Sequence, residues 1–544
     1  MFLIRDVMLV DGSGTEPRRA DVRIEGDRIA EISAANSTGE RDANALPETV
    51  VEGRGLALSP GFIDMHAHSD LALVADKQHV AKISQGVTTE VVGQDGIGYA
   101  PITDEWLPTI RSQIAGWNGH SELPIDWRSL SSYLEVLAKG TATNVAVLVP
   151  QGNLRMFTVG YEDRPASSRE ISQMKGLLTD SLDAGAVGMS SGLTYAPGMF
   201  ADTGELIELC KVVALHGGYY APHTRSYGGG ALGAYAEAIE IAKRSGCALH
   251  LTHATLNFTS NRGKAAEFLE MVDRARSDGV SLSLDTYPYL PGATTLAALL
   301  PSWLAAGGPD AMLLKLRKVL EERDVSIDHD SVRARLLESL NLTGSDGFHG
   351  ELANWSAIQI SGVSNPALAS LVGRTIDEVA TEEGEDPVDT VCRILIEDEM
   401  ATGILMHVGN EENVQAIMRH PSHCGGSDGI LTGNRPHPRA WGTFPRYLSH
   451  YVRDLGVLGL AECVRHLTYN PAKRLGLHDR GLVREGYFAD LVLFNPDLVR
   501  DEATFENPRQ PATGIEAVFV NGELAWWDGK RTPSVSGQVL GGRF

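Results

Sequence analysis

The sequence predicts an α/β protein with a (β/α)8 barrel, a small β domain formed from both chain termini, and an insertion before the last barrel strand. Two observations support this prediction. Eight short apolar runs alternate with helix-like segments between residues 59 and 480, a pattern typical of parallel strands joined by right-handed crossovers. Short alternating strands also lie at both ends of the chain. A doubly wound open sheet shares the local pattern and stays open as an alternative.

Residues 1–58 are expected to form the N-terminal part of the β domain. They contain the runs FLIRDVMLV and DVRIEGDRIAEIS, the second with a turn at Gly26-Asp27, and such short alternating runs predict strands. Residues 481–544 contribute GYFADLVLFNP and a hairpin through Asn521-Gly522. Because isolated strands cannot shield their own edges, we expect the two segments to pair into one β-sandwich domain.

Residues 59–480 form the predicted barrel. Its candidate strands are, in order, GFIDMHAH, GVTTEVVGQD, NVAVLVPQGN, AVGMSSGL, GYYAPHTR, CALHLTHA, VSLSLDTYPY and HCGGSDG. Residues from about 302 to 355 are rich in charge and helix-like, so we expect them to be an insertion after the seventh strand. WSAIQISG and GILMHVG are further candidate strands, which leaves the number of barrel strands open by one or two.

Composition excludes several classes of protein. Hydrophobic residues at 43% and charged residues at 22% are typical of a globular chain. The net charge of −23, with no basic cluster, argues against nucleic acid or an anionic membrane as partner. The N-terminus carries Arg5, Asp6 and Asp11 where a signal peptide needs an apolar core, and no apolar stretch is long enough to span a membrane. Five cysteines without a CxxC pair fit a reducing cytoplasm. The expected partner is a small molecule, and a homo-oligomer is possible.

Polar side chains gather at the C-terminal ends of the candidate strands, where barrels and open α/β sheets place their chemistry. The first strand ends in His66 and His68, and residues two apart on a strand face the same side. The other candidates end four further strands: Asp95, His223, His253 and Asp428. Four imidazoles and two carboxylates at one end form the ligand set of a one- or two-metal hydrolytic site and favour zinc.

Each candidate also has an ordinary structural explanation. His223 could be a hydrogen-bonded core histidine, and His250 competes with His253 three residues later. Asp95 in GQDG and Asp428 in GGSDG could be turn residues. Six such coincidences at the same end of the strands would be needed to explain these residues without a metal site. We therefore predict a metal centre.

Longer motifs extend from one end of the chain to the other. They are SPGFIDMHAHSD, GVTTEVVGQDGIGYAP, AVGMSSGLTYAPGMFADTGEL, HTR, LTHA, DTYPYLPGATTL, GGSDG with HPRAWGTFPRYL, and AKRLGLHDRGLVREGYFADLVLFNP. With these motifs the sequence resembles the amidohydrolase superfamily and, within it, the N-acyl-D-amino-acid deacylases (D-aminoacylases). The resemblance implies a (β/α)8 barrel with a small β domain from both termini and an insertion before the last strand. It also implies a metal centre formed by His66, His68, His223, His253 and Asp428.

The metal centre departs from that family's pattern at one position. Many members have a Cys ligand in a GNCG segment, where this sequence has Asp95. A carboxylate is a harder ligand than a thiolate and shifts metal preference. The end of the fourth strand also lacks the Lys that bridges two metals in related enzymes. Asp95 is therefore the expected bridge.

Only half of the family's anchors for a substrate carboxylate are present. Arg439 in HPR and Tyr287 in DTYPY match the pattern. Thr255 stands where a Lys is usual, and Ala293 stands where a Ser is usual. Thr294 follows Ala293 and completes the predicted substrate-binding set of Arg439, Tyr287, Thr255 and Thr294.

The predicted activity is metal-dependent hydrolysis of the amide bond in N-acyl-D-amino acids, which releases a carboxylate and a D-amino acid. One or two zinc ions would acidify water and polarise the carbonyl, Asp428 would transfer the proton, and Arg439 would hold a substrate carboxylate. Hydrolysis of a cyclic amide, an N-carbamoyl compound or a D-residue dipeptide stays open, as does a non-catalytic metal-barrel scaffold. The GxGxxG pattern at residues 228–233 resembles a dinucleotide site, but no acidic residue ends the next strand.

Overall fold

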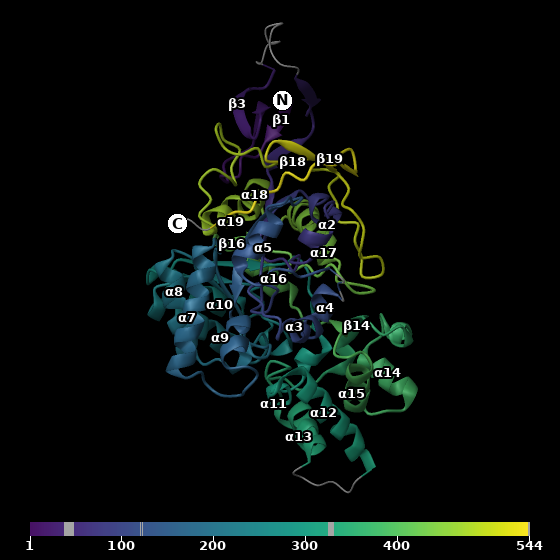
Figure 1. Cartoon of the computed structure of the whole chain (residues 1–544). Coiled ribbons are helices and arrows are strands. Elements are labelled where there is room, and N and C mark those ends of the chain that lie inside the picture. The colour runs from purple at the N-terminus through teal and green to yellow at the C-terminus, as the bar shows by residue number, and fades with distance from the viewer. Residues whose placement is uncertain (37–47, 120, 122, 325–330, 542–544) are drawn as a thin grey trace.

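The protein is described by a computed structural model that covers residues 1–36, 48–119, 121, 123–324 and 331–541. Figure 1 shows three regions along one axis. The β domain, built from purple and yellow segments of the two termini, lies at one end. The barrel lies in the middle, and a teal and green lobe formed by the inserted segment lies at the other end.

The barrel has the eight parallel strands that the sequence predicts. Their order is β16-β12-β11-β10-β9-β8-β7-β6, and a parallel bridge between Ala67 and Gly429 joins the two ends of the sheet. This nearly closed barrel excludes a doubly wound open sheet. The strands are β6 (Phe62–Asp64), β7 (Val87–Val92), β8 (Asn144–Pro150), β9 (Gly188–Gly192), β10 (Tyr219–His223), β11 (Ala248–Leu251), β12 (Leu282–Thr286) and β16 (His423–Gly425).

Apolar strand sequences and capped helices explain why this region forms a barrel. Every residue of β8, NVAVLVP, is buried, as expected for a parallel strand covered on both faces. Ser167 and Glu170 form a capping box at the start of α7, and α9 ends at Gly246 in the left-handed conformation. The main outer helices are α5 (Leu130–Leu137), α6 (Gln151–Thr158), α7 (Ser168–Asp183), α8 (Thr203–Leu215), α9 (Ala231–Ser245), α10 (Ala265–Ser277), α16 (Glu411–Met418), α18 (Leu460–Leu467) and α19 (Tyr469–Arg474). Figure 1 shows α7, α8 and α9 side by side outside the strands.

The β domain joins the two termini in one hydrogen-bonded sheet. Strand β17 pairs antiparallel with β5, which links the C-terminal strands to the N-terminal ones. The order is β20-β19-β18-β17-β5-β1-β2-β3, with β4 paired to β1. The strands are β1 (Phe2–Leu9), β2 (Arg18–Glu25), β3 (Arg28–Ala34), β4 (Thr49–Glu52), β5 (Ala57–Pro60), β17 (Leu491–Phe494), β18 (Ile515–Val520), β19 (Glu523–Trp527) and β20 (Lys530–Arg531). One apolar cluster includes side chains from both ends of the chain, among them Val22 and Phe519.

The inserted segment extends beyond residues 302–355 on both sides. Between β12 and β16 the chain forms a three-stranded antiparallel sheet in the order β13-β15-β14. The strands are β13 (Gly292–Thr295), β14 (Ile358–Gly362) and β15 (Gly403–Met406), and the helices are α11 (Ser302–Ala305), α12 (Gly308–Glu321), α13 (Val332–Glu338), α14 (Ile376–Glu383) and α15 (Pro387–Glu397). WSAIQISG and GILMHVG contribute β14 and β15, so they add nothing to the barrel. The predicted bounds covered α11, α12 and α13 and missed the three strands together with α14 and α15.

Two further findings concern the chain as a whole. All five cysteines are buried and free, in agreement with their interpretation as small buried apolar residues. Among the described residues, no helix combines the length and apolar character needed to cross a bilayer.

Candidate metal centre

The six candidate ligands converge at the C-terminal end of the barrel, and all six are buried. His66 and His68 follow β6, Asp95 follows β7, His223 ends β10, His253 follows β11 and Asp428 follows β16. Their donor atoms fall into two groups, each within 4.8 Å: His66, His68, Asp95 and Asp428, and then Asp95, His223 and His253. The parallel strands thus bring together residues separated by as many as 362 positions in the chain, His66 and Asp428.

Asp95 belongs to both groups. Its Oδ1 lies 3.6 Å from His66 Nε2 and 3.5 Å from His253 Nε2. Its Oδ2 lies 3.7 Å from His68 Nε2 and 3.4 Å from His223 Nδ1. One carboxylate thus faces four imidazoles, which is the placement expected of a group that bridges two cations.

Several donor atoms at this point have no hydrogen-bond partner. Both ring nitrogens of His66, Oδ1 of Asp95 and Nδ1 of His223 are buried without one. Buried polar atoms are rarely left unsatisfied, and imidazole nitrogen and carboxylate oxygen are donors that zinc accepts. The donor set therefore fits a metal ion.

Burial and the carboxylates pull the histidine pKa values in opposite directions. Burial lowers the pKa of His66 to about 4. Burial also opposes charge on His253, but the adjacent carboxylates of Asp95 and Asp428 raise its pKa to about 9. Despite burial, His223 and His66 hold the pKa of Asp95 well below its usual range. The acidic groups of the cluster are thus ionised at neutral pH.

The backbone is strained at three of the six candidates. Asp95, His253 and Asp428 have φ angles of 56°, 30° and 48°, a region that non-glycine residues seldom adopt. Such conformations cluster at functional sites. A Cβ on Gly192 would lie 2.0 Å from the Asp95 carbonyl oxygen, so glycine is required where β9 meets the loop that carries Asp95.

Residues not identified from the sequence support the histidines. Thr194 Oγ1 is 2.7 Å from His223 Nε2. Asp285 accepts a hydrogen bond from the backbone N–H of His253 at 2.8 Å and pairs with His250 Nε2 at 2.8 Å. His250 therefore does not compete for the metal centre. Asp285 ends its strand within the DTYPY motif, and the rule that selected Asp95 and Asp428 also applies to it.

Asp428 is held from two sides. Its Oδ1 lies 3.1 Å from His68 Nε2, and its Oδ2 lies 2.9 Å from Arg439 Nη2. Burial opposes the charge of Asp428, but the positive charge of Arg439 and the neighbouring imidazoles keep the pKa of its carboxyl below the usual range.

A buried ion pair lies behind the loop that carries Asp428. Lys82 Nζ donates to Asp64 Oδ2 at 2.5 Å and to Ser427 Oγ at 2.9 Å. Asp64 also accepts the backbone N–H of Ser427 at 2.8 Å. These contacts fix the residue that precedes Asp428.

Several of these candidate ligands line a pocket, which we call the metal chamber. Tyr287, Thr255 and Thr294 line it, together with His68, Asp95, His223, His253 and Asp428. Arg439 does not line it. The guanidinium is fully buried, lies 4.5 Å from the Tyr287 ring centroid, and has two nitrogens, Nε and Nη1, without a partner.

The inserted segment adds His349 to the same hollow. His349 is half-buried, and its Nδ1 is buried without a hydrogen-bond partner. Its backbone carbonyl accepts a bond from Ser226 and would lie 2.8 Å from a Cβ on Gly228. Gly228, the first glycine of the GxGxxG pattern, therefore allows close packing against the insertion, which replaces the interpretation of this pattern as a dinucleotide site.

Comparison with known proteins agrees with this geometry. The model of the family described as "Amidohydrolase family" matches residues 49–525. The chain belongs to the amidohydrolase family. It is 34% identical to a D-aminoacylase of Alcaligenes xylosoxydans xylosoxydans over 99% of this chain and 97% of that protein.

Two solved structures of relatives of this amidohydrolase each match over 99% of this chain and 99% of the relative's chain, with a TM-score of 0.80. One is a D-aminoacylase with a binuclear metal centre, which is 32% identical. The other, 30% identical, is an N-acyl-D-glutamate deacylase of Bordetella bronchiseptica with zinc and a phosphonate inhibitor that mimics the tetrahedral intermediate. The fold and family expected from the sequence are thus confirmed.

Proposed function

We propose that this amidohydrolase removes the acyl group from N-acyl-D-amino acids with the help of zinc. The observation that carries the proposal is the position of Asp95 between two groups of histidines, with Asp428 beside them at the wall of the metal chamber. The D-aminoacylase and deacylase relatives, which match over nearly the whole chain, support the substrate class.

We assign the cation to His66, His68, His223, His253, Asp95 and Asp428. Their unpartnered buried donors support this assignment. When zinc is bound, it supplies Lewis acidity, which polarises a carbonyl and acidifies water. Asp95 would help to hold both ions if two are bound, since it belongs to both donor groups.

Asp428 is the proposed general base and acid. Its carboxylate lines the chamber and is ionised, so it can accept a proton from the attacking water. The hydroxyl adds to the acyl carbon, the C–N bond breaks, and Asp428 returns the proton to the leaving nitrogen. The products are a carboxylic acid and a free amino acid. The bond to Arg439 fixes the orientation of the carboxylate for both transfers.

The substrate carboxylate is assigned to Tyr287 and Arg439. The two unpartnered guanidinium nitrogens of Arg439 can donate hydrogen bonds to an anionic group that approaches past Tyr287. Thr255 and Thr294 offer hydroxyls at the chamber wall. The five free, buried cysteines fit a cytoplasmic enzyme.

The test is a substrate screen with metal-counted protein. We expect hydrolysis of N-acetyl-D-amino acids and little or none of their L-enantiomers, hydantoins or D-dipeptides. Asp428→Asn should lower kcat at least about 1,000-fold while most zinc stays bound, because base catalysis and carboxylate charge are lost together. Asp163→Asn, at an exposed position, is the matched control. Turnover of only cyclic or L-substrates would refute the proposal.

A further inference from the structure

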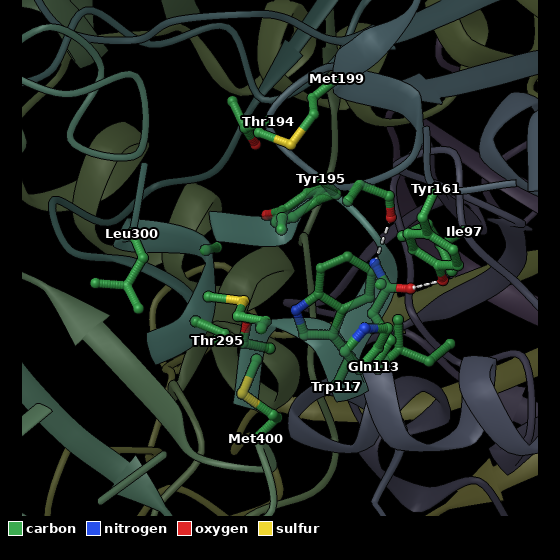
Figure 2. A pocket seen from close by; sticks show the side chains of 18 residues that line it. Ile97, Gln113, Trp117, Tyr161, Thr194, Tyr195, Met199, Thr295, Leu300 and Met400 are labelled. Atoms are coloured by element: carbon green, nitrogen blue, oxygen red, sulfur yellow. Dashed lines mark hydrogen bonds between the residues drawn. The ribbon is translucent and has the colours of Figure 1, made fainter. Parts of the chain in front are cut away.

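A second hollow adjoins the metal chamber, and nothing in the proposed chemistry uses it. We call it the apolar chamber. Its walls include Ile97, Tyr161, Met199, Leu300, Met312 and Met400. The space within these walls is about 60 Å³, which is room for a few water-sized groups. Figure 2 shows the aromatic and methionine side chains around this common space.

The two chambers share walls. Trp117, Thr194, Tyr195 and Ala298 line both. The ring of Trp117 lies 5.4 Å from that of His68, and the ring of Tyr195 lies 4.7 Å from that of His223, measured between centroids. The rings of Trp117 and Tyr195 also pack edge to face, with their centroids 4.8 Å apart. They therefore form the partition between the two chambers, and a substituent of a molecule held at the metal centre enters the apolar chamber when one of these rings turns aside.

The chemistry of the apolar chamber suits a hydrocarbon group. None of its described lining residues is charged. Its polar side chains are largely engaged within the protein: Gln113 bonds to Tyr161 and to the Ala196 carbonyl, and Tyr195 bonds to Thr294. The first two bonds are drawn in Figure 2. Three methionines, whose flexible thioethers adapt to apolar shapes, complete the walls. The chamber thus offers mainly dispersion contacts and burial of apolar surface.

The position of the apolar chamber around the barrel indicates which half of the substrate enters it. Tyr287 and Asp428 follow β12 and β16, which are neighbours in the ring. Ile97, Tyr161 and Met199 lie on the chain after β7, β8 and β9. In the strand order, β10 and β11 separate the pair β8 and β9 from the pair β12 and β16 on one side, and β6 and β7 separate them on the other. The barrel-loop side of the apolar chamber therefore lies across from Asp428 and Tyr287, and the inserted segment, with Leu300, Met312 and Met400, forms its other side.

We infer that the apolar chamber binds the acyl chain of the substrate, so that the preferred substrates carry an acyl group longer than acetyl. This inference rests on the proposed function. The leaving nitrogen must face Asp428, and the substrate carboxylate faces Tyr287 and Arg439, so the amino-acid half occupies the β12 and β16 side. The acyl carbon lies at the metal centre, and its substituent points across the barrel.

The experiment compares N-acetyl-, N-butanoyl- and N-hexanoyl-D-alanine, because a fixed, small side chain isolates the acyl group. Each added methylene should raise kcat/KM roughly three- to fourfold until the chamber is full, the gain expected from burying one CH2 group. Ala305→Leu and Met199→Trp place bulk in the chamber. In both variants we expect the ratio of kcat/KM for hexanoyl over acetyl to fall at least tenfold.

Ala306→Leu is the matched control, because Ala306 neighbours Ala305 but does not line the chamber. It should keep the wild-type ratio. Thermal midpoint and zinc content show whether each variant is folded. The inference is overturned if longer acyl chains bring no gain, or if the filled variants discriminate against N-acetyl-D-leucine instead of N-hexanoyl-D-alanine.

Binding of the free acid separates this inference from the proposed function. Zinc-loaded protein should bind hexanoate at least tenfold more tightly than acetate by calorimetry, and Ala305→Leu should remove the difference. If no N-acyl-D-amino acid is hydrolysed, the proposed function fails, and this comparison still decides the apolar chamber. Equal affinity for hexanoate and acetate would overturn it.

Discussion

Arg439 donates to Asp428 across a distance of 2.9 Å, and both side chains are buried. The guanidinium thereby stabilises the ionised carboxylate beside the histidines. Two of its nitrogens remain without a partner. The same arginine can thus orient the proposed general base and receive an anionic substrate, and these two roles predict different kinetic effects.

Arg439→Met should lower kcat/KM more for substrates with a carboxylate than for substrates without one. A charge-assisted hydrogen bond contributes about 1.5–3 kcal/mol, so kcat/KM for N-acetyl-D-leucine should fall roughly 10- to 100-fold further than that for N-acetyl-D-leucinamide. An equal loss for acid and amide would mean that Arg439 acts only on Asp428.

Asp95→Ala should remove more zinc than His223→Ala. Asp95 belongs to both donor groups, whereas His223 belongs to one. We expect at most one zinc per chain in His223→Ala and almost none in Asp95→Ala, as measured by elemental analysis after dialysis. Wild-type zinc content in Asp95→Ala would exclude it as a bridge, and Asp163→Asn serves as the surface control.

Thr194→Val should weaken zinc binding although Thr194 is not itself a proposed ligand. The hydroxyl of Thr194 is 2.7 Å from the Nε2 of His223, and partners of this kind fix the orientation of a metal-binding imidazole. A loss of about 10- to 100-fold in affinity is typical and can be measured by competition with a chelator. Thr194→Ser keeps the hydroxyl and should restore binding; similar affinities for Val and Ser would contradict this role.

Lys82→Met should destabilise the metal-free protein by about 3–5 kcal/mol, the usual effect of removing one partner from a buried ion pair. Lys82 is fully buried between Asp64 and Glu90, and the substitution leaves both carboxylates without their cation. Thermal unfolding provides the measurement. Lys211→Met breaks only a surface pair with Glu208 and should change little. Similar midpoints for the two variants would argue against the buried pair.

His466→Gln should flatten the loss of stability in mild acid. Burial and the charge of Arg465 lower the pKa of His466 to about 4, whereas an unfolded histidine titrates near 6.5. Between pH 6.5 and 4 this histidine is protonated in the unfolded chain but neutral in the folded chain. The free energy of unfolding therefore falls as the pH drops from 6.5 towards 4. The thermal midpoint of the metal-free variant should fall less over this range than that of wild type. The exposed His478→Gln should behave like wild type, and parallel curves for all three proteins would disprove the effect.

Much of the barrel and its candidate site could be predicted from local sequence. Strand β8 is apolar throughout because both faces of a parallel sheet are covered. The ends of such strands meet at one edge, so His66, Asp95 and Asp428 could be grouped without knowledge of their contacts. The limits of the insertion could not be predicted, because β14 and β15 have the short, largely buried pattern of barrel strands, whereas β13, with the sequence GATT, gives no strand signal.

The sequence alone therefore determined the fold class, the family resemblance and the six residues of the candidate metal centre, because strand periodicity and residue type are local properties. Tertiary structure alone decided that Asp95 faces both groups of histidines and that Arg439 pairs with Asp428 behind Tyr287. It also decided that Trp117 and Tyr195 form a wall between the metal chamber and an apolar chamber. These features depend on side chains from distant parts of the chain meeting at distances of a few ångströms, and only the packing of the whole barrel sets those distances.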